Sequence, residues 1–334
     1  MRLLRYRPSA PNFGDDLNTE LWPALVPSLF ANETDEGEDA FVGIGTIVGI
    51  DPGPSRNLHV FSSGVGYTAI DAWSGRAVEF HCVRGPVTAR VLGVDPDRAL
   101  TDGAILTTAI DRYRALPQEC RERTVVVPHY ETIAFPGWEE AVRMAGFDLV
   151  DPRTAPEAVI RKVSGSRLVL TESLHGAILA DAFGVPWRAF GVSRNFSTAK
   201  WADWTGSLGM RAQVVLLPPP DAIQLFRFGK RPEPFGAIVA LDQEVAYREF
   251  RARITSNSRA SFMKRQAKGL LEALPVARRT LGFSVERTAR ALMDLSAMPP
   301  FLSDAYRRAM LRDEMLERLH GVARRYGAGL AVTG

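Results

Sequence analysis

Two of the five histidines, His129 and His175, follow short runs of residues that are typical of buried strands. The apolar run Leu168–Leu170 predicts one such strand, and the polar turn Thr171–Ser173 leads from it into a helix that begins at about His175. A strand that passes into a helix across a polar turn gathers backbone N–H groups and the positive end of the helix dipole at one point. Such a point suits a phosphate or a carboxylate, so we predict an anion site at His175.

Small and polar residues also follow the first predicted strand. Asn12 or Asp15 could cap the next helix, and Gly14 allows a tight turn beside a ligand. Further on, the segment 43–49 imitates the glycine pattern of dinucleotide-binding proteins, but the next residues include two prolines and cannot continue a helix. We therefore predict no NAD site. We predict instead a glycine-rich turn, containing Gly45, at which backbone can approach a substrate.

Arg84 and His129 stand at the carboxyl ends of two further predicted strands, Val78–Val83 and Thr124–Val127. The planar fork of Arg84 could grip a phosphate or carboxylate there, although an ordinary surface arginine is the alternative. A single histidine is more often structural than catalytic, but a second histidine at a strand end favours a functional role for His129.

The segment 193–204 combines cations with tryptophans. Lys200 and Asp203 fall at helical spacing, and the faces of Trp201 and Trp204 could stack on sugar rings. The alternative is a tryptophan pair packed in the core. No metal-ligand spacing and no nucleophile or phosphate-loop motif occurs, so we expect no metal.

Composition is that of a globular protein, because 46% of the 334 residues are hydrophobic and 24% are charged. Two cysteines are too few for a disulfide framework and suggest a reducing compartment. The beginning of the chain lacks the apolar region of a secretory signal, and the longest uncharged apolar stretch, 41–50, is too short to span a bilayer. We therefore expect a cytoplasmic protein.

Charge is distributed unevenly along the chain. Residues 251–334 contain 16 Lys and Arg against 7 Asp and Glu, a net charge of +9 in a chain whose total is +3. Such a segment either meets an anionic surface or is a solvated helical face.

Strand-like runs alternate with helical patterns through most of the chain, which predicts the α/β class with parallel sheets. The expected strands are 3–6, 40–44, 58–62, 78–83, 124–127, 148–150, 167–170, 187–191 and 213–217, and the expected helices are 15–25, 87–92, 138–145, 156–162, 175–183, 198–207 and 221–228. We predict a Rossmann-like domain at 1–117, a second Rossmann-like domain at 118–236, and a basic helical tail at 237–334.

Taken in order, these residues resemble the polysaccharide pyruvyl transferase family over roughly the first two thirds of the chain. The resemblance rests on Asn12–Asp15, Arg84–Pro86, Thr101–Ala104, Val127–Tyr130, Thr171–Gly176 and Gly184–Pro186. The segments 11–18 and 200–204 look most like the branch that acts in succinoglycan-type exopolysaccharide synthesis.

The resemblance implies paired Rossmann-like domains arranged as in two-domain (GT-B-like) glycosyltransferases. It also implies transfer of a pyruvyl group from phosphoenolpyruvate to a sugar, often as a cyclic ketal, without a cofactor. His175 would contact phosphate and act as the general acid, with His129 as the alternative acid. Glu172 or Asp15 would act as the base toward the sugar.

The chain departs from the family pattern at one position, and this departure removes a positive charge. Many relatives have an arginine two residues before the histidine of this motif, where this chain has Ser173. The anion must then rely on helix N–H groups, on Ser173 and on a cation from elsewhere, with Arg84 and Arg194 as candidates. The expected substrate-binding residues are Arg84, Ser173, Asn12, Gly14, Gly45, Arg194, Lys200 and Trp201.

The expected partners are phosphoenolpyruvate and a lipid-linked oligosaccharide or polysaccharide acceptor. The basic segment 251–334 could hold the protein at the anionic inner face of the cytoplasmic membrane. Nucleic acid is not expected, since the segment shows no reader motif. Two alternatives stay open: a glycosyltransferase that uses a nucleotide sugar, and a non-catalytic module that binds an anionic polymer.

Overall fold

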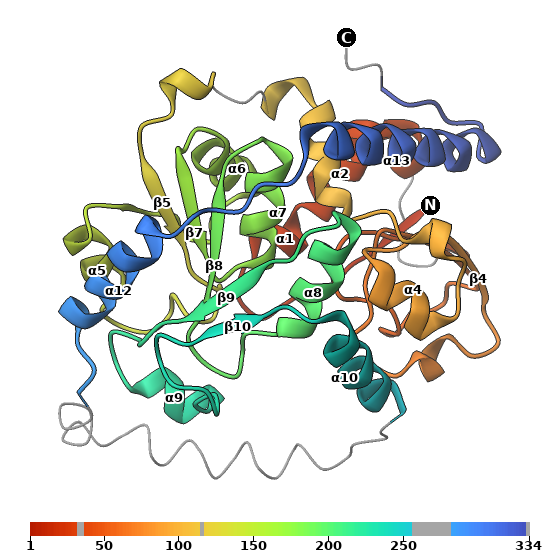
Figure 1. Ribbon diagram of the computed structural model, residues 1–334. Coiled ribbons are helices and arrows are strands. Elements are labelled where there is room, and N and C mark those ends of the chain that lie inside the picture. The colour runs from red at the N-terminus through yellow and green to blue at the C-terminus, as the bar shows by residue number, and fades with distance from the viewer. Residues whose placement is uncertain (32–36, 114–116, 256–281, 332–334) are drawn as a thin grey trace.

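The computed structural model describes residues 1–31, 37–113, 117–255 and 282–331, and these form two sheets with helices around them (Figure 1). The first sheet has the order β1-β2-β3-β4 and consists of β1 (Arg2–Leu4), β2 (Asp39–Val42), β3 (Asn57–Phe61) and β4 (Ala77–Cys82). The second has the order β10-β9-β8-β7-β5-β6 and consists of β5 (Thr124–Val127), β6 (Asp148–Leu149), β7 (Leu168–Thr171), β8 (Trp187–Gly191), β9 (Gln213–Leu216) and β10 (Ile238–Ala240). Every pair is parallel except β10 with β9.

Helices connect these strands in the manner of βα units. The α-helices are α1 (Phe13–Asp16), α2 (Asn18–Leu25), α3 (Pro27–Phe30), α4 (Pro86–Leu92), α5 (Trp138–Met144), α6 (Pro156–Ser164), α7 (Leu174–Ala182), α8 (Thr198–Ser207), α9 (Ile223–Phe228), α10 (Gln243–Thr255), α12 (Val285–Ala297) and α13 (Ala305–Arg325). The 3-10 helices are η1 (Ile70–Trp73), η2 (Pro96–Arg98), η3 (Gly103–Ala109), η4 (Asp111–Tyr113) and η5 (Gln118–Cys120).

The predicted α/β class with parallel sheets and a helical C-terminal region is confirmed. All residues of β5, β7 and β8 are buried, as expected for strands covered on both faces. β10 was not predicted, because three alternately exposed residues carry almost no periodic signal. It extends the second sheet beyond residue 236, where the sequence places the tail.

The two sheets share one buried apolar cluster, which runs from Leu3 on β1 to residues of α13. η3 packs against α7 and α13, and α4 packs against α8, so helices that follow one sheet contact helices that follow the other. The main-chain N–H of Phe13 also donates to the main-chain oxygen of Pro152 over 2.9 Å. These contacts fix the loops of the first half against those of the second.

The C-terminal helices pack on both halves. α12 lies against α5 at one end of the second sheet, and α10 packs on α4 and α8 (Figure 1). α13 returns to the first half, where Arg318 Nη1 donates to the main-chain oxygen of His81 over 2.8 Å. Within the described residues, no helix combines the length and apolarity that crossing a membrane requires.

Candidate active site

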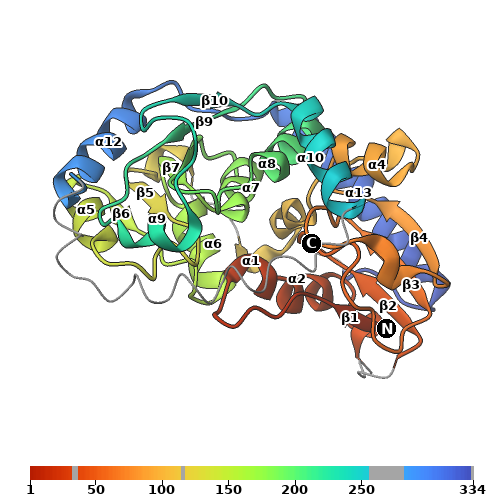
Figure 2. The same ribbon diagram turned by 90° about the horizontal axis from the view of Figure 1, so that it is seen from below.

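The carboxyl ends of the strands in the two halves supply the candidate residues. Figure 2 shows α1 and α2 of the first half and α7 and α8 of the second lying between the two sheets. In open parallel sheets this edge is where ligands bind, because the loops there converge and the helices begin there. The site residues therefore come from segments far apart in the sequence.

His175 lies in the first turn of α7. Ser173 caps this helix, and its Oγ accepts a hydrogen bond from the N–H of Gly176 over 3.4 Å. Gly184, with φ +66°, follows the helix, which Pro186 prevents from resuming. The expected strand, polar turn and helix are therefore present, and the His175 ring is placed on the nine-residue helix α7.

Gly14 packs directly against the His175 ring. A Cβ atom on Gly14 would lie 2.0 Å from His175 Nδ1, so no other residue fits without moving the imidazole. The other ring nitrogen, Nε2, is buried without a hydrogen-bond partner among the described residues. Its nearest carboxylate is Asp102 Oδ2, 3.9 Å away. Buried polar atoms are normally paired, so this nitrogen points to a ligand.

Asp102 is a further candidate residue, to which the sequence alone assigned no role. It lies in the segment Thr101–Ala104 and caps η3, with Oδ1 accepting from the N–H of Ala104 over 3.0 Å. Because Oδ1 makes the cap, Oδ2 is the oxygen that faces His175. The position of this segment in the family pattern was the available signal, but only the packing of η3 on α7 brings the two side chains together.

Asp15 and Lys200 lie close enough for the lysine charge to act on the carboxyl group. Asn12 Nδ2 donates to Asp15 Oδ2 over 2.7 Å, and Asn12 Oδ1 caps α1. Burial raises the pKa of Asp15, against the opposing charges of His175 and Lys200. The Lys200 ammonium also lies 4.6 Å from the ring centroid of Tyr67. Gly45 adjoins this group, since a Cβ on it would lie 3.7 Å from Asp15 Oδ1.

Arg84 is buried between the two halves, with 1% of its side chain exposed. Its Nε donates to Asp203 Oδ2 over 3.1 Å and its Nη1 to Thr46 Oγ1 over 2.8 Å. Its Nη2 has no partner among the described residues. Gly64 leaves room for the guanidinium, because a Cβ there would lie 2.3 Å from it. The Arg84 side chain is therefore no surface arginine, and one of its donors is unused.

His129 and Glu172 share a network at the ends of β5 and β7. Glu172 Oε2 accepts from the N–H of His129 over 3.1 Å, and its Oε1 accepts from the N–H of Val192 over 3.3 Å. Burial raises the pKa of Glu172 to about 7. With 3% exposure, its carboxyl group is used in holding together the ends of β5, β7 and β8.

The His129 ring is held by its neighbour Asn195, whose Nδ2 lies 3.0 Å from His129 Nδ1. Because Asn195 Nδ2 can only donate, this contact makes Nδ1 the acceptor. Burial and the nearby Lys200 charge lower the pKa of His129 to about 3. The ring is therefore neutral near pH 7, which disfavours it as the acid.

The structure places Trp201, the expected sugar-stacking residue, in the core. Its side chain is 2% exposed and packs against Phe196, Trp187 and Trp204. The tryptophans form a core contact, the alternative left open above. Their helix, α8, turns Lys200 toward the site and Asp203 toward Arg84.

Arg194 lies on the surface, where its Nε donates to the main-chain oxygen of Lys230 over 2.9 Å. Neither its hydrogen bonds nor its contacts join it to His175. Lys200, and not Arg194, is the cation whose charge acts on Asp15 and His129. Ser173 acts as a helix cap in this structure.

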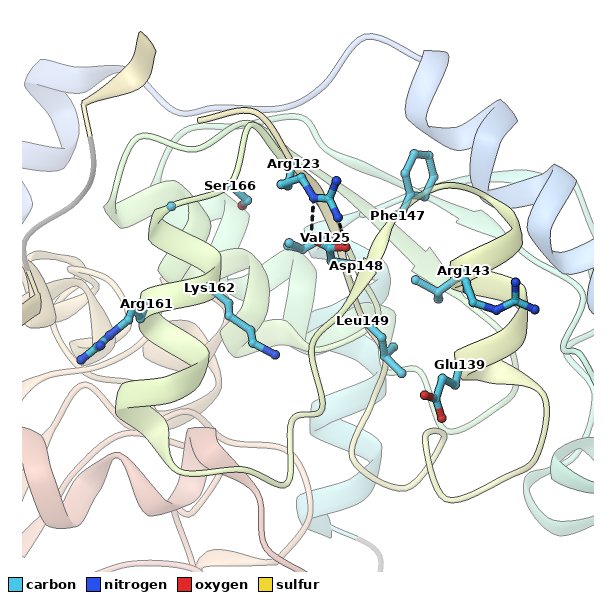
Figure 3. A pocket seen from close by; sticks show the side chains of 12 residues that line it. Arg123, Val125, Glu139, Arg143, Phe147, Asp148, Leu149, Arg161, Lys162 and Ser166 are labelled. Atoms are coloured by element: carbon cyan, nitrogen blue, oxygen red, sulfur yellow. Dashed lines mark hydrogen bonds and ion pairs between the residues drawn. The ribbon is translucent and has the colours of Figure 1, made fainter. Parts of the chain in front are cut away.

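A separate hollow of about 580 Å³ lies at the amino ends of β5 and β7 (Figure 3). Its lining includes Arg123, which pairs with Asp148, together with Arg143, Lys162 and Ser166. None of the candidate active-site residues lines it. The hollow is therefore distinct from the carboxyl-end site.

Two comparisons with known proteins give matches. The fold defines an α/β protein with parallel sheets, and residues 59–194 match the family model of polysaccharide pyruvyl transferase. The chain is also 37% identical over 202 residues to the succinoglycan biosynthesis protein ExoV of Rhizobium meliloti (strain 1021). That match covers 60% of this chain and 62% of the relative's length. The predicted resemblance to the family and to its succinoglycan branch is therefore confirmed. A comparison with solved structures found no match.

Proposed function

We propose that this protein transfers a pyruvyl group from phosphoenolpyruvate to two hydroxyl groups of a sugar in an exopolysaccharide repeat unit, forming a ketal and releasing phosphate. The observation that carries the proposal is the buried, unpartnered Nε2 of His175 at the start of α7. The family match and the succinoglycan relative support the same reaction class. The proposed arrangement of the two halves is that of two-domain glycosyltransferases.

Phosphoenolpyruvate carries a phosphate and a carboxylate, so its site needs cations and N–H donors. Lys200 supplies the first cation, and Arg84 Nη2 is a second donor held in place by Asp203 and Thr46. The first turn of α7 adds backbone N–H groups and its dipole. Together these groups replace the arginine that stands at the position of Ser173 in many relatives.

The acid must deliver a proton to the methylene carbon of the enol. We assign this proton to His175 Nε2, with Gly14 and Asp102 fixing the orientation of the ring. Proton transfer turns the methylene into a methyl group and makes C2 electrophilic. One sugar hydroxyl then bonds to C2, the C2–O bond to phosphate breaks, and a second hydroxyl closes the ketal. Of the two hydroxyl protons, taken up one after the other by the base, one leaves with phosphate and the other restores the proton that His175 gave to the methyl group.

Asp15 is the proposed base for these hydroxyl protons. Its pKa is raised by burial, which makes it a better proton acceptor than an exposed aspartate. Asn12 holds one carboxylate oxygen, and the glycine at position 45 leaves space beside the other. Glu172, the other expected base, is not assigned this role here, because its carboxyl oxygens accept from the main-chain N–H groups of His129 and Val192.

The acceptor is proposed to be lipid-linked, with the basic segment 251–334 at an anionic membrane face. Five of the nine net positive charges of this segment fall on 256–281, outside the described residues. Sedimentation with vesicles tests the idea: binding to anionic vesicles and not to neutral ones is expected. Equal binding to both would contradict an electrostatic attachment.

The function is tested by measuring pyruvate on the exopolysaccharide of a strain with and without the gene. Loss of ketal-linked pyruvate is expected, with restoration by the native chain and not by His175→Gln. Unchanged pyruvate content together with a shortened sugar repeat would favour the glycosyltransferase alternative.

A further inference from the structure

A second histidine cluster lies on the first sheet, away from the strand ends. His59 on β3 is directly opposite Glu79 on β4, and His81 follows two residues later on the same face of β4. One ligand atom from each side chain lies within 4.8 Å of those of the other two. The two histidines are buried, at 8% and 5% exposure, while the Glu79 side chain is 44% exposed.

The distances suit a small divalent ion. His59 Nδ1 lies 3.0 Å from His81 Nε2 and 3.6 Å from Glu79 Oε2. For tetrahedral Zn²⁺ with ligands at about 2.0–2.1 Å, neighbouring ligand atoms lie about 3.3 Å apart. The facing nitrogens would therefore separate by only about 0.3 Å to receive such an ion.

The hydrogen bonds behind His59 orient its free nitrogen toward the cluster. The Tyr326 hydroxyl lies 2.8 Å from His59 Nε2 and also bonds to Asp39. Because the Asp39 carboxylate can only accept, Tyr326 donates to it and accepts from the N–H at His59 Nε2. His59 Nδ1 is then unprotonated and faces Glu79 and His81. Metal-binding histidines are typically held in this way.

His81 can likewise carry its ring proton on the nitrogen that does not bind the ion. With Nε2 as the ligand, the proton resides on Nδ1, which lies 3.7 Å from Glu79 Oε1. The ion then replaces the proton that the two imidazoles share, and the second oxygen of Glu79 faces the new N–H. Each of the three side chains keeps a polar neighbour.

Arg325 is the competing cation. Its Nη1 lies 2.7 Å from both oxygens of Glu79, and the arginine side chain is 56% exposed, so it can move into solvent. Arg325 and Tyr326 both belong to the C-terminal end of α13. The state of the cluster is thus coupled to the docking of α13 on the first sheet.

We propose that His59 Nδ1, His81 Nε2 and Glu79 Oε2 bind one divalent transition-metal ion of the Zn²⁺ type, with the fourth position open toward the exposed side of Glu79. The site lies on a strand face beside the end of α13, away from the strand ends that carry the candidate active site. It is independent of the proposed pyruvyl transfer.

Titration of the full-length, metal-stripped protein with Co²⁺ and Zn²⁺ tests the proposal. One ion per chain is expected, with the visible absorption of tetrahedral Co²⁺ and a higher Tm in Zn²⁺. His81→Gln should abolish both, whereas His320→Gln, at an exposed position of α13, should change neither. Less than stoichiometric binding by the native chain, or full binding by His81→Gln, would overturn the proposal.

Two further variants keep the test valid if His81→Gln fails to fold. Tyr326→Phe removes the acceptor behind His59 and should weaken Co²⁺ affinity about 10- to 100-fold. Arg325→Gln removes the cation that competes for Glu79 and should strengthen the affinity for Co²⁺. Unchanged affinity in both variants would contradict the assigned ligands.

Discussion

The molecule holds two pairs of histidines, and their positions relative to the strands separate their roles. His129 and His175 follow the carboxyl ends of β5 and β7, where loops converge and helix α7 begins. His59 and His81 lie within β3 and β4, on a sheet face covered by α13. A histidine past a strand end can meet a diffusing substrate, whereas a histidine within a covered strand can meet only its neighbours or a small ion.

The two histidines of the first pair differ in their surroundings. His129 is neutral near pH 7 and its Nδ1 accepts from Asn195, while His175 has an unpartnered Nε2 beside Asp102. Position at a strand end is therefore insufficient to make a catalytic group. The atoms that surround each ring decide which histidine can transfer a proton.

The largest expected effect comes from His175→Gln. Removing a general acid typically lowers kcat by about 10²–10⁴-fold, and we expect that loss in phosphate release from phosphoenolpyruvate. His320→Gln provides the matched control and should retain native activity. Comparable activity in His175→Gln and His320→Gln would show that the histidine at the strand end matters no more for catalysis than the exposed one.

Gly14→Ala tests the placement of the same ring without changing it. The new Cβ would meet His175 Nδ1 at 2.0 Å, so the imidazole must move. A displacement of about 1 Å costs on the order of 10²-fold in rate, and we expect that loss in kcat in a folded protein whose Tm is lowered by the overpacking. Gly321→Ala, where nothing lies within 4 Å, serves as the control. Native kcat in Gly14→Ala would show that the ring position is unimportant.

Lys200→Met separates the two proposed sources of positive charge. Loss of a charged hydrogen bond of roughly 1.5–3 kcal/mol should raise KM for phosphoenolpyruvate about 10- to 100-fold. Lys230→Met, at an exposed position, should leave KM unchanged. If Lys200→Met kept the native KM, Arg84 would have to bind the anion alone.

The last expected effect concerns stability at the strand ends and leaves the chemical step aside. The pKa of Glu172 is raised in the folded state to about 7 from 4.5, so folding favours its protonated form. Its contribution is full below pH 4.5 and is lost as pH rises through 7, a change of about 3 kcal/mol. Urea unfolding of Glu172→Gln across this window should therefore show a weaker loss of stability with rising pH. Parallel pH curves for the native chain and the variant would contradict this assignment.

The sequence predicted the strands and helices well because their patterns are local. The runs Val125–Val127 and Leu168–Leu170 are apolar throughout, and Gly184 and Pro186 mark the end of α7. The strand, polar turn and helix that place His175 were predicted for the same reason, since they are contiguous in sequence. The exposed, three-residue β10 gave no comparable signal.

The remaining features depend on contacts between distant segments. Asp102 approaches His175 only because η3 packs on α7, and Arg84 is buried only because α8 brings Asp203 to it. Trp201 could not be placed from its neighbours in sequence, because a helical tryptophan is equally compatible with core and surface. His59 and His81 are 22 residues apart and carry no recognisable ligand spacing until β3 and β4 pair.

The central claim is most directly tested by incubating the purified protein with ¹³C-labelled phosphoenolpyruvate and the lipid-linked repeat unit of the producing strain. NMR then follows phosphate and the ketal carbon together. The account predicts one ketal formed for each phosphate released, and neither product with His175→Gln. Intact phosphoenolpyruvate, with a nucleotide sugar consumed in its place, would contradict it.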